Sequence, residues 1–228
     1  GNSGLTPYDG GLVRVSPEGK PDRRPYFRTR SKLDSAAILR GGVLYVGSED
    51  GYLLAIPVGA EKGVSLWNQA AEQGYTGGFV NSSPAIAQDG VLVVASRHEK
   101  VWGFTPDGTV AWCAQVPGQI LGSPVIDRHG HVYVGVSLAE RGQTPSGSLV
   151  SIDGNSHKIR WQYAAVGPVE STPVIGDDDT LYFGDNAGAI HALDGRGKAL
   201  WTAKVESPVR SAGTILAPER LAFGLDDD

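Results

Sequence analysis

The sequence predicts an all-β protein, a β-propeller of four-stranded antiparallel blades, and three observations lead to that prediction. A repeat of 40 to 50 residues recurs along the chain, and each repeat holds four short apolar runs separated by Gly, Asp, Asn or Pro. The composition agrees, because 32 glycines and 14 prolines among 228 residues indicate many turns and therefore many short strands. No stretch of 12 residues shows a clean helical period.

Each repeat begins with an isoleucine that follows a cluster of small residues or proline. In "SPVIDRHGHVYVGV", which starts at Ser123, apolar and polar residues alternate as in a strand with one buried face. The equivalent isoleucines lie 48, 40, 49 and 40 residues apart, at Ile38, Ile86, Ile126, Ile175 and Ile215. These intervals predict blades at about 31–80, 81–120, 121–169 and 170–209 within a single domain, 1–228.

A tryptophan ends the second half of each repeat. In "IHALDGRGKALW", from Ile190, an Asp-Gly turn returns the chain for an outer strand that carries the tryptophan. Because a small sheet cannot bury both faces alone, we expect this side chain to pack between neighbouring blades. The expected inter-blade residues are Trp67, Trp112, Trp161 and Trp201, with Phe27 in the equivalent position near the start.

The two ends of the chain read as complementary half-repeats. Residues 1–30 resemble the last two strands of a repeat, and residues 210–228 resemble the first two. We expect them to form a fifth, composite blade in which the strand near Leu12–Val15 pairs with the strand near Leu221–Gly224. Such closure would leave no open sheet edge. The alternative is that the chain is one part of a larger ring.

These motifs resemble the PQQ-like repeat family of β-propellers. The resemblance rests on "LYVGSEDGYLLAI" from Leu44, "GSLVSIDGNSHKIRW" from Gly147 and "LYFGDNAGAIHALDGRGKALW" from Leu181. The family includes quinoprotein alcohol dehydrogenases, the scaffold lipoprotein of bacterial outer-membrane assembly, and sensor domains attached to kinases. Its members usually have seven or eight blades, so five is a departure. The resemblance implies a bacterial protein in the periplasm or outside the cell.

The resemblance implies a non-catalytic scaffold that binds a protein or another ligand, and two alternatives stay open. One is a PQQ-dependent oxidoreductase, or a fragment of one, with PQQ and calcium as cofactors. The family's dehydrogenases need two adjacent cysteines, whereas this chain has a single cysteine, Cys113. The other alternative is a five-bladed lectin-like sugar binder. For the scaffold we expect no catalytic residue and no cofactor.

The acidic and histidine clusters favour ordinary turns over metal sites. Asp177–Asp179 lies in a predicted hairpin turn, and Asp226–Asp228 ends the chain; neither has the spaced oxygen ligands of a calcium loop. His129 and His131 flank a turn glycine, and no third ligand has a clear position. Cys113 lies in an apolar run, so we expect a small buried side chain.

Charge and hydropathy exclude two kinds of partner. The net charge of −5 and a pI near 5.5 provide no basic field for nucleic acid. No run of 18 apolar residues is present for a membrane span. A basic run favours a solvated sheet edge over a polyanion site; its cations are Lys20, Arg23, Arg24, Arg28, Arg30 and Lys32.

We expect a protein partner or small ligand to bind the propeller face that carries two sets of loops. These are the connections between blades and the turns between the second and third strands of each blade. The polar insertion at 138–147 is longer than its counterparts. The candidate residues are Arg30, Lys32, Asp34, Glu49, Asp50, Phe79, Asn81, Arg97, His98, Gln119, Glu170, Asn186 and Arg210.

Overall fold

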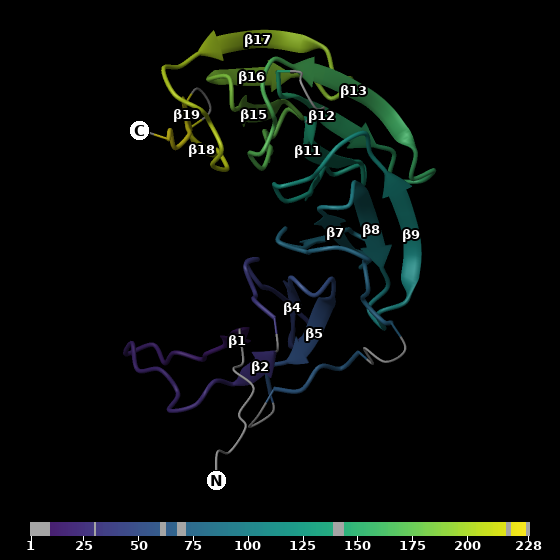
Figure 1. Ribbon diagram of the computed structural model, residues 1–228, viewed down its shortest axis with the longest axis vertical. Helices are drawn as coiled ribbons and strands as arrows, with labels where there is room; N and C mark the ends of the chain where they lie inside the picture. The colour runs from purple at the N-terminus through teal and green to yellow at the C-terminus, as the bar shows by residue number, and fades with distance from the viewer. Residues whose placement is uncertain are drawn as a thin grey trace.

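In the computed structural model the sheets follow one another in chain order along an open arc (Figure 1). The structure describes residues 10–29, 31–59, 63–67, 72–138, 144–217 and 220–226. Over these ranges the regular elements are all strands. The described part of the chain contains no helix long and apolar enough to cross a membrane.

Three consecutive sheets are four-stranded antiparallel meanders. The first contains β6 (Ala85–Ile86), β7 (Leu92–Ser96), β8 (Lys100–Phe104) and β9 (Val110–Gln115). The second contains β10 (Val125–Ile126), β11 (Val132–Leu138), β12 (Ser146–Ile152) and β13 (Ile159–Ala165). The third contains β14 (Val174–Ile175), β15 (Leu181–Asp185), β16 (Ala189–Leu193) and β17 (Ala199–Lys204). The predicted all-β fold with four-stranded blades is confirmed. The insertion at 138–147 is described only at its ends, because 139–143 lie outside the described residues.

A three-stranded sheet precedes these, formed by β3 (Ile38–Arg40), β4 (Val43–Gly47) and β5 (Leu53–Pro57). Each end of the arc then carries a two-stranded sheet. β1 (Gly10–Leu12) pairs with β2 (Phe27–Thr29), and β18 (Thr214–Ala217) pairs with β19 (Arg220–Ala222).

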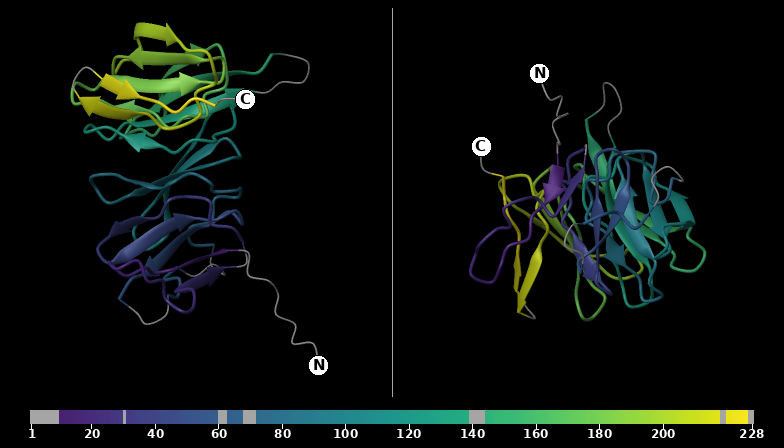
Figure 2. Two further views of the ribbon diagram at one scale, coloured as in Figure 1. Left: turned by 90° about the vertical axis from the view of Figure 1, so that its left-hand side faces the viewer. Right: turned by 90° about the horizontal axis from the view of Figure 1, so that it is seen from below.

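The predicted composite blade is wrong, because β1–β2 and β18–β19 are separate sheets at opposite ends of the arc (Figures 1 and 2). The described parts of 1–30 and 210–228 therefore do not form one shared sheet within this molecule. Leu12 pairs with Phe27, and Val15 forms a bridge to Pro21 rather than to the strand near Leu221. The physical reason is geometric: the rotation from each sheet to the next does not add up to a full turn over the sheets described.

The core consists of apolar layers between adjacent sheets. Between β6–β9 and β10–β13, for example, Val93 and Val101 pack with Val134 and Val150, and all four side chains are buried. Comparable layers lie between β1–β2 and β3–β5, between β3–β5 and β6–β9, and between β10–β13 and β14–β17. Each sheet is thus stabilised mainly by the sheets before and after it.

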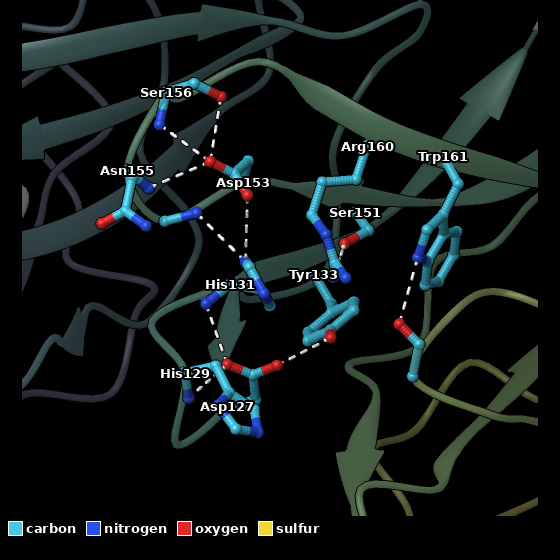
Figure 3. Close-up of polar contacts among 12 residues, drawn as sticks. Asp127, His129, His131, Tyr133, Ser151, Asp153, Asn155, Ser156, Arg160 and Trp161 are labelled. Carbon is cyan, nitrogen blue, oxygen red and sulfur yellow. Dashed lines mark hydrogen bonds and ion pairs between the residues drawn. The ribbon is translucent and has the colours of Figure 1, made fainter.

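Two tryptophans join neighbouring sheets by hydrogen bonds as well as by packing. Trp67 Nε1 donates to the Pro106 carbonyl oxygen at 3.1 Å, and Trp161 Nε1 donates to that of Gly195 at 3.3 Å (Figure 3). In each case the acceptor belongs to the turn before the outer strand of the next sheet.

The other residues at this position differ in environment. Trp112 stacks on the His157 ring of the next sheet, with centroids 4.7 Å apart. Phe27 is partly buried against the layer that contains Leu54. Trp201 is 44% exposed, and its ring lies beside that of Tyr182 in the same sheet.

Glycines on the second strand of three sheets leave room for the segment that connects one repeat to the next. Gly47, Gly135 and Gly184 lie against Val80, Val169 and Val209, which are all buried. A β-carbon at any of these glycines would overlap the valine. The glycine therefore allows the connecting segment to pack directly against the strand.

We therefore expect Gly184→Ala to lower the free energy of unfolding by about 1–3 kcal/mol, the usual cost of overpacking. Urea denaturation measures the change. Gly59→Ala is the matched control, because Gly59 has no atom within 4 Å of its ideal β-carbon. Equal midpoints for the two variants would contradict this account.

Candidate functional site

The two sets of loops expected to carry the binding face are hydrogen-bonded to each other. The Glu49 amide donates to the Lys32 carbonyl at 3.1 Å, and the Arg97 amide donates to the Phe79 carbonyl at 3.1 Å. Each bond joins a connection between sheets to a turn between second and third strands. Both sets therefore lie on one side of the arc, and we call this surface the loop face.

Side chains of the loop face also link different repeats. Asn81 Nδ2 lies 3.5 Å from Asp34 Oδ2 and 3.4 Å from Glu49 Oε1. At the other end of the face, Arg210 Nε lies 3.4 Å from Glu170 Oε2. Arg210 also forms an ion pair with Asp226. Asp226 is the only residue of the terminal run Asp226–Asp228 that the structure describes.

Most of the candidate residues present their side chains to solvent. The exposed ones are Lys32, Asp34, Asp50, Phe79, Arg97, His98, Gln119 and Arg210, and the half-buried ones are Glu49, Asn81, Glu170 and Asn186. Arg30 lies outside the described residues. Phe79, at 51% exposure, gives the face a solvent-exposed aromatic group.

A chain of hydroxyl groups fixes the spacing of the loops, and the sequence reasoning missed it. The Ala36 amide donates to Ser83 Oγ at 3.0 Å, the Ser83 amide to Ser123 Oγ at 2.9 Å, and the Ser123 amide to Thr172 Oγ at 2.9 Å. Each bond joins one repeat to the next. The signal was present in the sequence, since all three hydroxyl residues precede a proline at the same point of the repeat.

A second polar cluster lies in the turns of the β10–β13 sheet (Figure 3). The buried Asp127 carboxylate accepts the backbone N–H groups of His129 and His131, each at 2.8 Å, and the Tyr133 hydroxyl at 2.8 Å. His131 Nδ1 lies 3.6 Å from Asp153 Oδ2. These contacts brace two turns. Across the described ranges, no three His, Cys, Asp or Glu side chains gather in a way that would hold a metal ion.

The Tyr133 phenol of this cluster gives a pH prediction. Burial, together with the hydrogen bond to Asp127, raises the pKa of Tyr133 from its usual 10.0 to about 12. As pH rises from 10 to 12, the unfolded chain loses this proton while the native protein keeps it, so stability falls over that window. We expect Tyr133→Phe to lose less stability over the same window than the parent, as measured by denaturation at each pH. Equal losses would contradict the assignment.

The remaining singled-out residues have structural surroundings. Asp178 Oδ1 accepts the Thr180 amide at 3.1 Å, and such bonds lower the pKa of Asp178. Asp179 pairs with Arg128 of the preceding sheet. The expectation that Cys113 is buried is wrong, because its side chain is exposed. It lies on β9, the outer strand of its sheet, where alternate side chains meet solvent.

A buried carboxylate on β15 is a further residue that the sequence reasoning did not single out. Asp185 is fully buried, and its Oδ2 lies 3.0 Å from His191 Nε2. Its Oδ1 accepts the amides of Ala187 and Ala189 at 3.0 and 2.9 Å. The carboxylate thereby holds the turn between β15 and β16, which belongs to the loop face.

Antiparallel four-stranded sheets that pack face to face along an arc define a protein of the β-propeller class. The family model described as outer membrane protein assembly factor BamB matches residues 19–137 and 57–217. The chain belongs to this family of PQQ-like repeat propellers, and the predicted resemblance is confirmed.

One relative agrees with this assignment in sequence, and two solved structures share the fold. Outer membrane protein assembly factor BamB of Nitrosomonas eutropha is 27% identical over 173 residues, which is 73% of this chain and 38% of that protein. The match thus spans well under half of the relative's length. The crystal structure of BamB from Moraxella catarrhalis has a TM-score of 0.52 at 13% identity, covering 92% of this chain and 75% of the other. The Dos1 propeller has a TM-score of 0.64 at 13% identity, with 91% and 54% covered.

Proposed function

We propose that this chain is a protein-interaction scaffold that binds its partner on the loop face. One observation carries the proposal: loops from successive repeats are tied into one surface by backbone hydrogen bonds. The Arg97 amide donates to the Phe79 carbonyl at 3.1 Å, and the Asn186 amide donates to the Pro168 carbonyl at 2.9 Å. A surface fixed in this way binds a folded partner with little loss of loop entropy.

The chemistry of the loop face suits a protein partner. Phe79 provides an exposed aromatic group, and Arg97 lies next to it in the same hydrogen-bonded pair of loops. Aromatic and arginine side chains are enriched among the residues that dominate binding energy at protein interfaces. Exposed carboxylates such as Asp34 and Asp50 add polar contacts at the rim.

Family membership supports a partner and a place. Because the related proteins are named as outer-membrane assembly factors, we propose that the partner takes part in outer-membrane protein assembly. We propose a periplasmic location for the same reason.

The test is a binding measurement with the purified outer-membrane assembly components of the source organism. We expect Phe79→Ala combined with Arg97→Ala to weaken binding at least about tenfold, because truncated hot spots cost more than about 1.4 kcal/mol. Leu200→Ala combined with Arg196→Ala is the control, since both side chains are exposed outside the loop face. The proposal would be contradicted if the control pair weakened binding as much as the test pair. It would also be contradicted if the parent chain did not bind at all.

We also propose that the chain acts without PQQ or calcium. Its single cysteine cannot form the adjacent pair associated with the family's dehydrogenases, so the residues present do not fit that cofactor. We expect no dye-linked alcohol or sugar dehydrogenase turnover in the presence of both cofactors. Turnover that depends on added quinone would overturn this part of the proposal. Saturable binding in a glycan screen would favour the sugar-binding alternative.

A further inference from the structure

The two ends of the arc carry complementary halves of one repeat, and the C-terminal end carries the first half. Beside β18–β19, Ser211 Oγ donates to the Gly224 carbonyl oxygen at 3.1 Å and accepts the Gly224 amide at 2.7 Å. In the complete β14–β17 sheet, Ser171 Oγ makes the same two bonds with Gly184, at 2.8 and 3.0 Å. β18 and β19 therefore correspond to the first and second strands of a complete sheet.

The N-terminal end carries the second half. In the turn 16–20, the first amide donates to the fifth carbonyl and the fourth amide donates to the first carbonyl, each at 2.9 Å. The turns 105–109 and 194–198, which join the third and fourth strands of their sheets, make the same two bonds at the same length. β1 and β2 therefore correspond to the third and fourth strands.

In two complete sheets this turn receives a tryptophan from the sheet before it. A β-carbon at Gly108 would lie 2.6 Å from the Trp67 ring, and one at Gly197 would lie 2.6 Å from the Trp161 ring. Each indole also donates its N–H to a carbonyl oxygen of the turn that it covers. The tryptophan and the turn are therefore matched partners across these two inter-sheet contacts.

At the ends of the arc, each of these partners is present without the other. Gly19, the counterpart of Gly108 and Gly197, is exposed and has no atom of the described structure within 4 Å of its ideal β-carbon. Trp201 is 44% exposed, whereas Trp67 is 5% exposed. The turn 16–20 and Trp201 belong to opposite ends of the arc, so they do not meet within one molecule (Figures 1 and 2).

The strands at the two ends are open in the same complementary way. β19 and β1 each pair with a single strand of the described structure. Aligning the turn 16–20 with 194–198 places Val13 and Val15 at the positions of His191 and Leu193. The two valines are 53% and 61% exposed, whereas His191 and Leu193 are 3% and 0% exposed. An open strand edge with exposed apolar side chains favours pairing with another chain.

Charge is also complementary between the two ends. Residues 10–32 contain seven Lys or Arg and two acidic residues, whereas residues 205–228 contain five acidic residues and two Arg. Unlike ends of two copies therefore attract each other, and like ends repel. This complementarity favours a second copy of the chain, joined head to tail, as the occupant of the open ends.

We infer that copies of this chain associate head to tail, with β19 of one copy beside β1 of the next in a four-stranded sheet. Leu181 lies opposite Leu193 in the β15–β16 pairing, and the same register would place Leu221 opposite Val15. Because the contact joins two different surfaces, it repeats from copy to copy until a ring closes or the series ends.

The same contact would give Trp201 the turn that its counterparts cover. Trp201 of one copy would lie over Gly19 of the next, and its indole N–H would donate to the Pro17 carbonyl oxygen. Pro17 has the position in its turn of Pro106, which accepts the Trp67 indole N–H. The inference does not rest on the proposed function, because none of these residues is a loop-face candidate.

Sedimentation equilibrium of the whole chain tests the association, over about 1 to 200 µM protein. We expect reversible association that Trp201→Ala weakens at least about tenfold, because truncated aromatic anchors dominate binding energy. Leu200→Ala is the matched control, since Leu200 is 53% exposed on the same strand. A parent chain that stays monomeric throughout overturns the inference, and so does equal weakening by the two variants.

A mixing experiment tests whether the contact is head to tail. Val15→Glu impairs the β1 edge and leaves Trp201 intact, whereas Trp201→Ala impairs the other end and leaves β1 intact. Where the parent is associated, each variant alone should be largely monomeric. Their mixture should form a one-to-one complex and no larger species, because one intact contact remains for each pair. The inference fails if the mixture stays monomeric, or if Val166→Glu, a control at a residue 76% exposed away from both ends, impairs association as much as Val15→Glu.

Disulfide formation tests the register in a Cys113→Ser background, where each variant has one cysteine. A mixture of Val15→Cys and Leu221→Cys should form a linked pair of chains, since opposed residues of antiparallel strands have Cα atoms about 4.5–5.5 Å apart. Leu216→Cys replaces Leu221→Cys as the control, because Leu216 is 65% exposed on β18, two strands away from β1 in the proposed sheet. Equal linkage with both partners would contradict the inference, and so would no linkage in a mixture that associates.

Discussion

Replacing Trp67 by alanine is expected to lower the free energy of unfolding by about 3–5 kcal/mol, the range for large aromatic truncations in a core. Trp67 is only 5% exposed, and its ring lies against Tyr45 of its own repeat and Phe104 of the next. The substitution removes that inter-sheet contact and also leaves the Pro106 carbonyl without the indole N–H. Urea or thermal denaturation of the purified variant measures the loss.

Trp201→Ala is the matched control, since Trp201 occupies the equivalent position of its repeat but is 44% exposed. We expect its cost to stay below about 1.5 kcal/mol, because less apolar surface leaves the core. If the two variants lose the same stability, the tryptophan at this position does not act by joining adjacent sheets.

Asp185→Ala is expected to cost about 3–5 kcal/mol, as for other buried polar networks that lose one partner. The fully buried carboxylate satisfies two backbone amides and lies within hydrogen-bonding distance of His191. Alanine leaves these groups unpaired in a site that water does not reach. Denaturation measures the loss, and the loop-face binding assay should show weaker binding as well, because the turn after β15 is no longer held.

Asp194→Ala tests whether burial of the carboxylate, and not only its hydrogen bonds to a turn, causes the large loss expected for Asp185→Ala. Asp194 Oδ1 also accepts two backbone amides, those of Arg196 and Lys198, each at 2.9 Å, but its turn is solvent-exposed. We expect a cost of about 1 kcal/mol, because water replaces the lost bonds. A loss as large as that of Asp185→Ala would show that burial is not the source of the effect.

The local pattern of the sequence predicted the repeats well, because each strand is marked by its own alternation. Ile126 and Ile175 lie at the ends of β10 and β14, where the repeat places them, and Trp161 lies on the outer strand β13. The loops named as the binding face also come together, since their order within a repeat determines on which side of the sheet they lie.

Three features could not be predicted from local pattern. The rotation between successive sheets depends on packing across each layer, so the open arc was missed although each sheet was anticipated. The exposure of Cys113 follows from its alternation on an outer strand, which an apolar run does not reveal. The pairing of Asp185 with His191 depends on the register of β15 and β16, which sets how the two side chains meet.

The open arc also determines how the protein exchanges its amide protons. Core layers cover the β10–β13 sheet on both sides, whereas β1–β2 and β18–β19 lie at the two ends of the arc and have a neighbouring sheet on one side only (Figure 1). Opening therefore costs least at the two ends and most in the middle, as in a one-dimensional chain of coupled units. Native-state hydrogen exchange should show protection that rises from both ends toward β11 and β12, and uniform protection would indicate a single cooperative unit.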